Sequence, residues 1–237
     1  MIDVLAMVAH PDDAELLCAG ALLRAADLGQ RTGILDLTAG EAGSAGTRAG
    51  RAAERERASA ILGLAERRSA DLPDGAVENT PAVRLQIAAL LRELRPRVVI
   101  LHWPEARHPD HRAAAELGRD ACFIAGMHRA AAPGEAHRPV KILHALTYQE
   151  HAPKPTFVVD ISAQMERKLD AIFAYDSQFA GKQRMGDVMG GERPLRDQIL
   201  AHHAHYGSLI RRPYGEPYYT RETMRVDDLM TLEAASM

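Results

Sequence analysis

The chain alternates short apolar runs with longer segments of helical spacing, and this alternation constrains its fold more than any other feature. Residues 2–8 form an apolar run rich in Val, Ile and Leu, typical of a parallel strand covered on both faces. Residues 14–28 place apolar side chains at helical spacing and stop before Gly29, which favours a helix end. The same pair of patterns recurs, with strands expected at 32–37, 66–71 and 97–101 and helices at 51–63, 81–94 and from about 111.

Repeated strand–helix units predict an α/β fold of the Rossmann-like, doubly wound type, with a mostly parallel sheet and helices on both faces. Two more strands are expected at 142–149 and 157–161, and helices at about 162–175 and 194–210. From about residue 212 the sequence is rich in Pro, Gly and Tyr, which predicts irregular structure over the surface or the rim of a site. The length of 237 residues fits one domain spanning 1–237.

The charge balance excludes several kinds of partner. A formal net charge of -3 leaves no basic surplus for binding a nucleic acid or an anionic membrane surface. No apolar run approaches the roughly 18 residues that a membrane span needs, so we expect a soluble protein with a small-molecule partner. Cys18 and Cys122 lie in helix-like apolar patterns and are expected to be buried free thiols, which is compatible with a reducing cytoplasm.

Two clusters of His and Asp follow two of the expected strands. His-Pro-Asp-Asp occupies residues 10–13, after the first strand, and His-Pro-Asp-His occupies residues 108–111, after the strand at 97–101. In open α/β sheets, ligands collect at the carboxyl ends of strands near the point where the strand order reverses. With the strand order 3-2-1-4, the fourth strand lies beside the first, and we expect the two clusters to form one site.

Together the clusters contain the ligands of a hydrolytic metal site. Such a site uses three His or carboxylate ligands and leaves one position open for water. His10, Asp13 and His111 supply this set. Metal coordination lowers the pKa of water toward ~7, and Asp12 is left over to take the proton. Two imidazoles and a carboxylate also suit ferrous iron, so the expected cofactor is zinc, with iron as the alternative.

His108 and Asp110 complete the expected catalytic group. His108 is expected to face the substrate carbonyl, where it stabilises the oxyanion or protonates the leaving amine, while Asp110 orients its other ring nitrogen. A simpler interpretation is that Asp12, Asp13 and Asp110 are only helix N-caps. The presence of both clusters at strand ends favours the metal site.

Three other features are given weaker functional interpretations. The segment with glycines at 40, 43 and 46 lacks the Gly-Lys-Ser/Thr ending of a P-loop, and the turn after the first strand has no G-x-G-x-x-G, so no nucleotide cofactor is expected. This segment is expected to be a mobile loop near the site. His-His-Ala-His at 202–205 is expected on a solvated helix face, and Trp103 in packing, with a minor binding role left open.

At these residues the sequence resembles the LmbE/PIG-L family of zinc-dependent sugar N-deacetylases. Both of its principal motifs, AHPDD-x-E and HPDH, are intact at 9–15 and 108–111. Later stretches, AYDSQF at 174–179 and YGSLI…YGEPYY at 206–219, are similar to the branch that acts in bacillithiol biosynthesis. Further family matches are D-L-T-x-G-E at 36–41, Gly46-Thr47, Arg51 with Glu54, and LPDG at 72–75.

The resemblance implies hydrolysis of N-acetylglucosaminyl-malate to glucosaminyl-malate and acetate, in the cytoplasm, by a hexameric enzyme. The family's metal ligands, general base and assisting histidine fall on the residues already assigned to these roles. Its substrate-binding arginine falls on Arg51, whose guanidinium would suit the malate carboxylates. Glu15 and Glu41, which belong to the matched motifs, are further candidate substrate-binding residues.

The sequence leaves alternatives open. Some family members hold the tetrahedral intermediate with a tyrosine near the start of the last helix, but residues 192–200 contain none. Either His108 and the metal suffice, or Tyr206 or Tyr214 substitutes. The substrate could instead be another N-acetylglucosamine conjugate, such as a lipid-linked sugar or a chitooligosaccharide. A non-catalytic sugar- or metal-binding protein is a further alternative, although pure binding has no use for Asp12.

Overall fold

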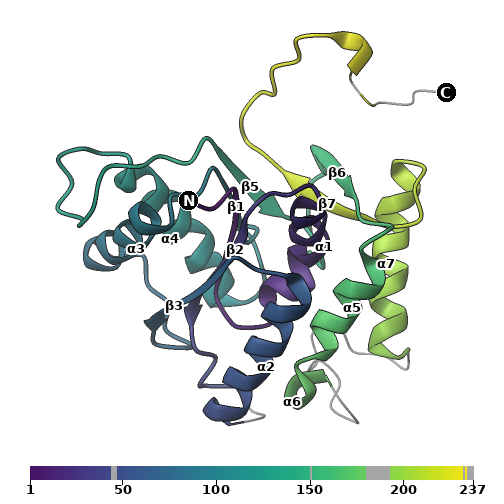
Figure 1. Cartoon of the computed structure of the whole chain (residues 1–237), viewed down its shortest axis with the longest axis horizontal. Helices are drawn as coiled ribbons and strands as arrows, with labels where there is room; N and C mark the ends of the chain where they lie inside the picture. The colour runs from purple at the N-terminus through teal and green to yellow at the C-terminus, as the bar shows by residue number, and fades with distance from the viewer. Residues whose placement is uncertain (44–46, 150, 180–192, 232, 234–237) are drawn as a thin grey trace.

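A single seven-stranded sheet forms the centre of the protein, with the strand order β3-β2-β1-β4-β5-β7-β6 (Figure 1). The computed structural model describes residues 1–43, 47–149, 151–179, 193–231 and 233. Within this part of the chain, β7 runs antiparallel to both of its neighbours and the other pairs are parallel. The strands are β1 (Val4–Val8), β2 (Thr32–Thr38), β3 (Glu66–Leu72), β4 (Val98–Leu101), β5 (Lys141–Ala145), β6 (Phe157–Asp160) and β7 (Gly215–Tyr219).

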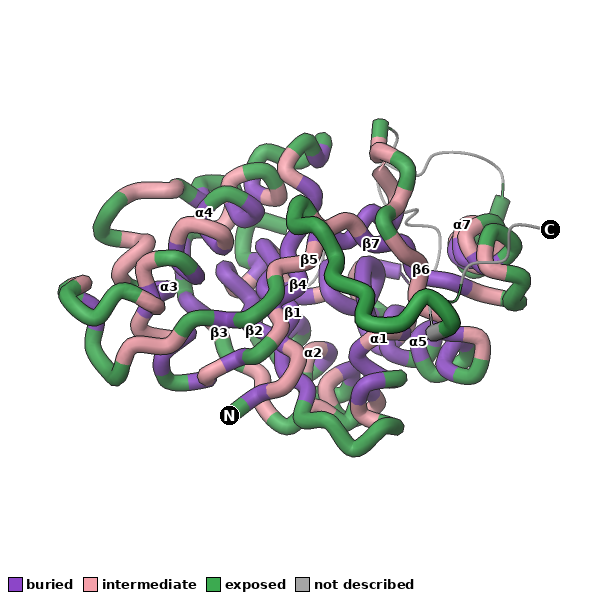
Figure 2. Tube along the Cα trace, turned by 90° about the horizontal axis from the view of Figure 1, so that it is seen from above, coloured by how far each residue is buried: buried purple, intermediate pink, exposed green. Residues whose placement is uncertain are grey.

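Helices cover both faces of the sheet. Because successive side chains of a strand point to opposite faces, Leu5 and Met7 of β1 pack with helices α3 and α4, whereas Ala6 and Val8 pack with α1, α2 and α5. Figure 2 shows the buried positions concentrated around the central strands. The expected doubly wound α/β fold is confirmed. The helices are α1 (Asp13–Asp27), α2 (Arg48–Leu62), α3 (Pro81–Leu94), α4 (Pro109–Ala125), α5 (Met165–Phe173), α6 (Asp176–Phe179) and α7 (Leu195–Leu209).

The expected order of the first four strands is confirmed, and it brings two loops together. β1 pairs with β4, with Ala6 opposite Ile100, so the chain leaves both strands at the same edge of the sheet. The turn before α1 and the turn before α4 therefore start side by side. Cys18 and Cys122 are buried and free, as expected. In the described part of the chain, no helix has the length and apolar character needed to cross a membrane.

The expectation of irregular structure from about residue 212 is wrong for Gly215–Tyr219, which forms β7 between β5 and β6. Gly and Pro in this segment are typical of turns, and its pairing partners lie far away in the sequence, so local composition does not reveal the strand. Glu216 is fully buried, forms an ion pair with Lys168 at 2.7 Å and accepts hydrogen bonds from the amides of Gly20 and Ala21 in α1. Beyond β7 the chain extends away from the sheet to a short 3-10 turn, Leu229–Thr231 (Figure 1).

The histidines of α7 do not form a solvated face. His203 is fully buried and its Nδ1 lies 2.8 Å from the Ile199 carbonyl oxygen, while His202 Nε2 accepts a hydrogen bond from the Tyr148 amide at 3.2 Å. The expectation of solvation is therefore wrong for His202 and His203, whereas His205 is exposed. Burial, reinforced by nearby Lys168, lowers the pKa of His202 from 6.5 to about 4.

We expect this burial to make the protein sensitive to acid. The unfolded chain binds a proton at His202 near pH 6.5 and the folded chain only near pH 4, so the stability contributed above pH 6.5 is lost as the pH falls toward 4. At ~1.4 kcal/mol per pKa unit, the loss from His202 is about 2–3 kcal/mol between pH 7.5 and 4.5. Urea unfolding at both pH values should show a smaller difference for His202→Gln than for the parent. The exposed control His128→Gln should match the parent, and an equal pH dependence in all three proteins would contradict the expectation.

Candidate metal centre and active site

Residues 10–13 form a tight turn between β1 and α1. The His10 amide donates to Asp13 Oδ2 at 2.8 Å, and Asp12 has a φ of 101°, in the left-handed region that Asp and Asn tolerate better than most side chains. Asp12 occupies the N-cap position of α1, but its side chain makes no capping hydrogen bond. The N-cap interpretation therefore does not account for its carboxylate, which lines a pocket instead.

Helix α4 begins at Pro109 rather than at about residue 111. Proline is well suited to the first position of a helix, and His108 is the N-cap, with its Nδ1 accepting a hydrogen bond from the Asp110 amide at 3.1 Å. The HPDH segment is thus the first turn of α4. This helical turn sets the direction of His111 relative to His108, and the two ring centroids lie 4.8 Å apart.

His10, Asp13 and His111 meet although their turns are about a hundred residues apart. One donor atom from each lies within 4.8 Å of the other two. Asp13 Oδ1 is 3.1 Å from His111 Nε2, and Asp13 Oδ2 is 3.2 Å from His10 Nδ1. Zinc–ligand bonds of about 2.0–2.2 Å in tetrahedral geometry place donor atoms roughly 3.4 Å apart. Both the chemistry and the spacing of this set therefore fit a divalent cation.

Asp110 contacts both histidines, His10 through its carboxylate and His108 through its backbone amide. Its carboxylate accepts hydrogen bonds from the amides of Gly75 at 2.8 Å and Val77 at 3.3 Å, and its Oδ2 lies 3.2 Å from His10 Nε2. The backbone amide of Asp110 donates to His108 Nδ1 at 3.1 Å, so Asp110 does contact a ring nitrogen of His108, through its amide and not through its carboxylate. A carboxylate on one ring nitrogen leaves the other free for a metal, which is a common arrangement around ligating histidines.

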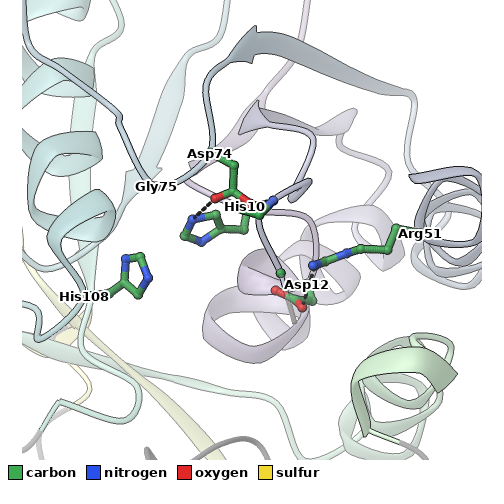
Figure 3. Close-up of a pocket in the computed structure, with 8 residues that line it drawn as sticks. His10, Asp12, Arg51, Asp74, Gly75 and His108 are labelled. Carbon is green, nitrogen blue, oxygen red and sulfur yellow. Dashed lines mark hydrogen bonds and ion pairs between the residues drawn. The ribbon is translucent and has the colours of Figure 1, made fainter. Parts of the chain in front are cut away.

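A pocket of about 260 Å³ opens beside the donor atoms, slightly below the ~300–1,000 Å³ typical of small-ligand sites (Figure 3). Arg51 reaches into its wall from α2, and Nη2 donates to Asp12 Oδ2 at 3.0 Å and to the Pro11 carbonyl at 2.8 Å. Gly40 has a φ of 69°, and a Cβ added there would lie 2.8 Å from Arg51 Cζ, so this glycine makes room for the guanidinium. The pocket is lined by His10, Asp12, Ala42, Gly43, Arg51, Asp74, Gly75 and His108.

The electrostatics of the site favour a positive charge. Burial and the neighbouring Asp13 keep the pKa of Asp12 well above its usual range, while Arg51 opposes the rise. At His10, burial disfavours protonation, but Asp13 and other carboxylates outweigh it and raise the pKa to about 10. Burial also acts to raise the pKa of Asp13, but the surrounding imidazoles hold it well below its usual range. This concentration of carboxylates suits a cation.

The two candidate glutamates lie in different places. Glu15 is fully buried, and its Oε1 is 2.6 Å from Nη1 of Arg67. The other two nitrogens of this guanidinium, Nε and Nη2, donate to the two carboxylate oxygens of Asp36. This network lies away from the pocket lining, so the expected substrate contact of Glu15 is wrong and its contacts tie α1 to the sheet. Glu41 lies at the pocket rim, where its Oε1 accepts a hydrogen bond from the Asp74 amide at 3.0 Å.

Neither substitute tyrosine lines the pocket in the described part of the chain. The Tyr206 ring packs against His202 and His205 on α7, and Tyr214 packs against the hydrophobic cluster beside α5. Trp103 is buried in packing, next to His144 and Tyr219. Gly46 and residue 192, which entered the expectations above, lie outside the described residues. Of the expected assisting groups, the one that faces the pocket is His108.

Sequence reasoning assigned no role to three residues of the site, although LPDG at 72–75, which contains two of them, was among the family matches. Asp74 lines the pocket, with Oδ1 3.1 Å from His10 Nε2, and Gly75 lines it too. His102 lies behind the donor atoms and is fully buried. All three follow the carboxyl ends of β3 or β4, the same signal that identified the two His/Asp clusters, so a scan of every strand end would have found them.

Comparisons with known proteins decide the family. The model of the PIG-L family, described as GlcNAc-PI de-N-acetylase, matches residues 5–122, which include both His/Asp turns. The diacetylchitobiose deacetylase of Thermococcus kodakarensis is 34% identical over 188 residues, which are 74% of this chain and 70% of that protein. The chain belongs to the PIG-L family of de-N-acetylases. This confirms the expected class of enzyme, an N-acetylglucosamine-type deacetylase.

Solved structures show the same fold along the length of the chain. A conserved protein of Thermus thermophilus is 38% identical, with a TM-score of 0.85 over 96% of this chain and 98% of that one. The N,N'-diacetylchitobiose deacetylase of Pyrococcus horikoshii is 24% identical, with a TM-score of 0.76 over 92% of this chain and 82% of that one, and shows the shared fold.

Proposed function

We propose that this PIG-L family member is a metal-dependent hydrolase that removes the acetyl group from an N-acetylglucosamine-type sugar. The observation that supports this proposal most is that donor atoms of His10, Asp13 and His111 lie within 4.8 Å of one another. They lie beside a pocket that Asp12 and His108 line from different turns. Zinc is the first choice of metal, and ferrous iron, which the same ligands suit, is the second.

The residues around the three proposed metal ligands each have a separate role in amide hydrolysis. A bound divalent cation would supply Lewis acidity, polarising the acetyl carbonyl and lowering the pKa of water. Asp12 takes the proton that the attacking water loses, with its Oδ2 steadied by Arg51. His108 Nδ1 already accepts a hydrogen bond, so its neutral ring carries its hydrogen on Nε2, from which it donates to the oxyanion. The C–N bond breaks as the departing amine takes the proton that Asp12 accepted from water, and acetate and the amino sugar leave.

Two substrates are the leading candidates. N-acetylglucosaminyl-malate, our first choice from sequence, has the support of the motifs similar to the bacillithiol branch. Diacetylchitobiose has the support of the Thermococcus relative. Arg51 bears on the choice, because its Nη2 is already engaged by Asp12 and Pro11. A bidentate contact to a malate carboxylate through this nitrogen requires Arg51 to release Asp12, whereas a neutral sugar makes no such demand.

Acetate release from purified, zinc-loaded protein tests the activity and ranks the substrates. We expect release from N-acetylglucosaminyl-malate, diacetylchitobiose or a lipid-linked N-acetylglucosamine, and the largest kcat/KM identifies the physiological class. His111→Ala, which removes one proposed ligand, is the matched inactive control. An absence of acetate from every conjugate, with protein that holds stoichiometric metal, contradicts the proposed function.

The resemblance to the bacillithiol branch also carries proposals about the whole molecule. We propose that residues 1–237 form a single deacetylase domain, supported by the continuity of the seven-stranded sheet. A cytoplasmic location and a homo-hexamer are the remaining proposals. Light scattering of the purified protein tests the hexamer.

A further inference from the structure

His102 is the first residue after β4, and it contacts the residues of the candidate metal site on the side away from the pocket. Its ring stacks on His111, with centroids 4.1 Å apart and an interplanar angle of 17°. Its Nε2 lies 3.0 Å from the amide nitrogen of Ala9, the residue before His10. The same nitrogen is 3.4 Å from Asp13 Oδ2. One buried imidazole therefore touches two of the three proposed ligands and the backbone leading to the third.

The hydrogen bonds of His102 determine which of its ring nitrogens carries the hydrogen. Because Nε2 accepts the hydrogen bond of the Ala9 amide, it carries a lone pair, and the ring hydrogen resides on Nδ1. Nε2 therefore donates nothing to Asp13. His102 is also absent from the donor groups that could hold a metal in the described part of the chain. His102 therefore affects the site through its ring, which stacks on His111, and through the hydrogen bond from the Ala9 amide.

The contacts of His102 are made with the site and not with the core alone. Nδ1 of His102 is buried and has no hydrogen-bond partner among the residues that the structure describes, so the imidazole carries an unsatisfied donor that an aliphatic side chain would avoid. Unsatisfied buried polar groups lower stability and are therefore uncommon in cores. The two contacts that balance this loss, with His111 and with Ala9, both belong to the site.

We propose that His102 is a positioning residue, which fixes the ring plane of His111 and the backbone before His10 so that the donor atoms are preset for a divalent cation. The inference rests on the proposed function only in that it requires the site to bind such a cation. It adds a residue that neither motif contains, placed by the pairing of β4 with β1.

Metal affinity and coordination geometry test this role separately from catalysis. His102→Leu removes both contacts, whereas His102→Gln restores an acceptor for the Ala9 amide. His203→Leu is the matched control, because His203 is also fully buried, has one unpartnered ring nitrogen and lies on α7. Each protein is stripped of metal, and its Zn²⁺ affinity is measured by competition with a chelating dye. The visible absorption of the Co²⁺ form reports the coordination geometry, and thermal melting of the metal-free form reports stability.

We expect His102→Leu to bind Zn²⁺ about 10–100-fold more weakly than the parent and to alter the Co²⁺ spectrum, as outer-shell substitutions around metal-ligating histidines do. His102→Gln should recover part of the affinity, and His203→Leu should change melting without changing affinity. If His102→Leu does not fold, the comparison rests on His102→Gln, and a parent-like affinity and Co²⁺ spectrum in that variant overturn the inference.

Three further outcomes are decisive. An affinity of His102→Leu within twofold of the parent, or an equal loss in His203→Leu, overturns the positioning role. A parent protein that binds no cation overturns the metal site together with this inference. A parent that binds Zn²⁺ in the expected manner but releases no acetate overturns the proposed activity alone.

Discussion

Replacing Asp12 by asparagine is expected to lower kcat for acetate release by about 10²–10⁴-fold, the usual contribution of a positioned general base. The amide cannot take the proton of the attacking water, so the loss falls on the chemical step. Asparagine is the sharpest substitution here because Asp12 has a φ of 101°, which asparagine tolerates and alanine does not. We expect the variant to keep its Zn²⁺ affinity within a few-fold, because Asp12 lies outside the donor set.

Asp71→Asn is the matched control for this experiment. Asp71 is also an aspartate with a positive φ, 52°, but it is exposed and lies away from the pocket lining. Its substitution should leave kcat unchanged. A kcat for Asp12→Asn within about threefold of the parent would show that another group accepts the proton, and the role assigned to Asp12 would then be wrong.

Removing metal is expected to abolish acetate release almost completely. The pocket side chains that remain can bind and orient a substrate, but they include no group that replaces Lewis-acid polarisation of the acetyl carbonyl. Dialysis against a chelator, followed by desalting, should give folded but inactive protein. Adding Zn²⁺ or Fe²⁺ should restore activity, and the better of the two identifies the preferred metal. Ca²⁺ should not, because it favours six to eight oxygen ligands over imidazole.

The His111→Ala variant separates a catalytic metal from a merely stabilising one. We expect it to remain inactive at metal concentrations that fully restore the stripped parent, because only two proposed ligands remain. Full activity in a parent preparation with substoichiometric metal, measured by elemental analysis, would contradict metal dependence. The melting temperature of each preparation controls for unfolding during chelation.

The meeting of the two His/Asp turns could be predicted from sequence because it depends on local patterns. The apolar runs and helical segments of the first half identify four parallel strands, and the strand order 3-2-1-4 places the residues after β1 and β4 at one edge. Their carboxyl ends carry His10 and His111 toward the same place. The three proposed ligands follow from these local patterns together with the strand order that the sequence analysis assumed.

The features that were missed depend on contacts between distant segments. Glu15 belongs to the AHPDD-x-E motif, but whether its side chain faces the pocket or the sheet depends on its ion pair with Arg67 of β3. The charged partner of Asp12 is Arg51, and the space for this pair depends on the backbone of Gly40. The position of His102 after a strand marks it as a candidate, but its contacts with Ala9 and His111 depend on the pairing of β4 with β1. Such roles are set by packing rather than by periodicity.

The position of β7 has a consequence for how the protein is made. As the chain emerges from the ribosome, β1 to β5 can pair with one another, but β6 has no neighbour in the sheet until residues 215–219 have been synthesised. The same late segment delivers Glu216 to the amides of Gly20 and Ala21. The helix that begins with Asp13 therefore acquires these two buried contacts only after residue 216 has been synthesised.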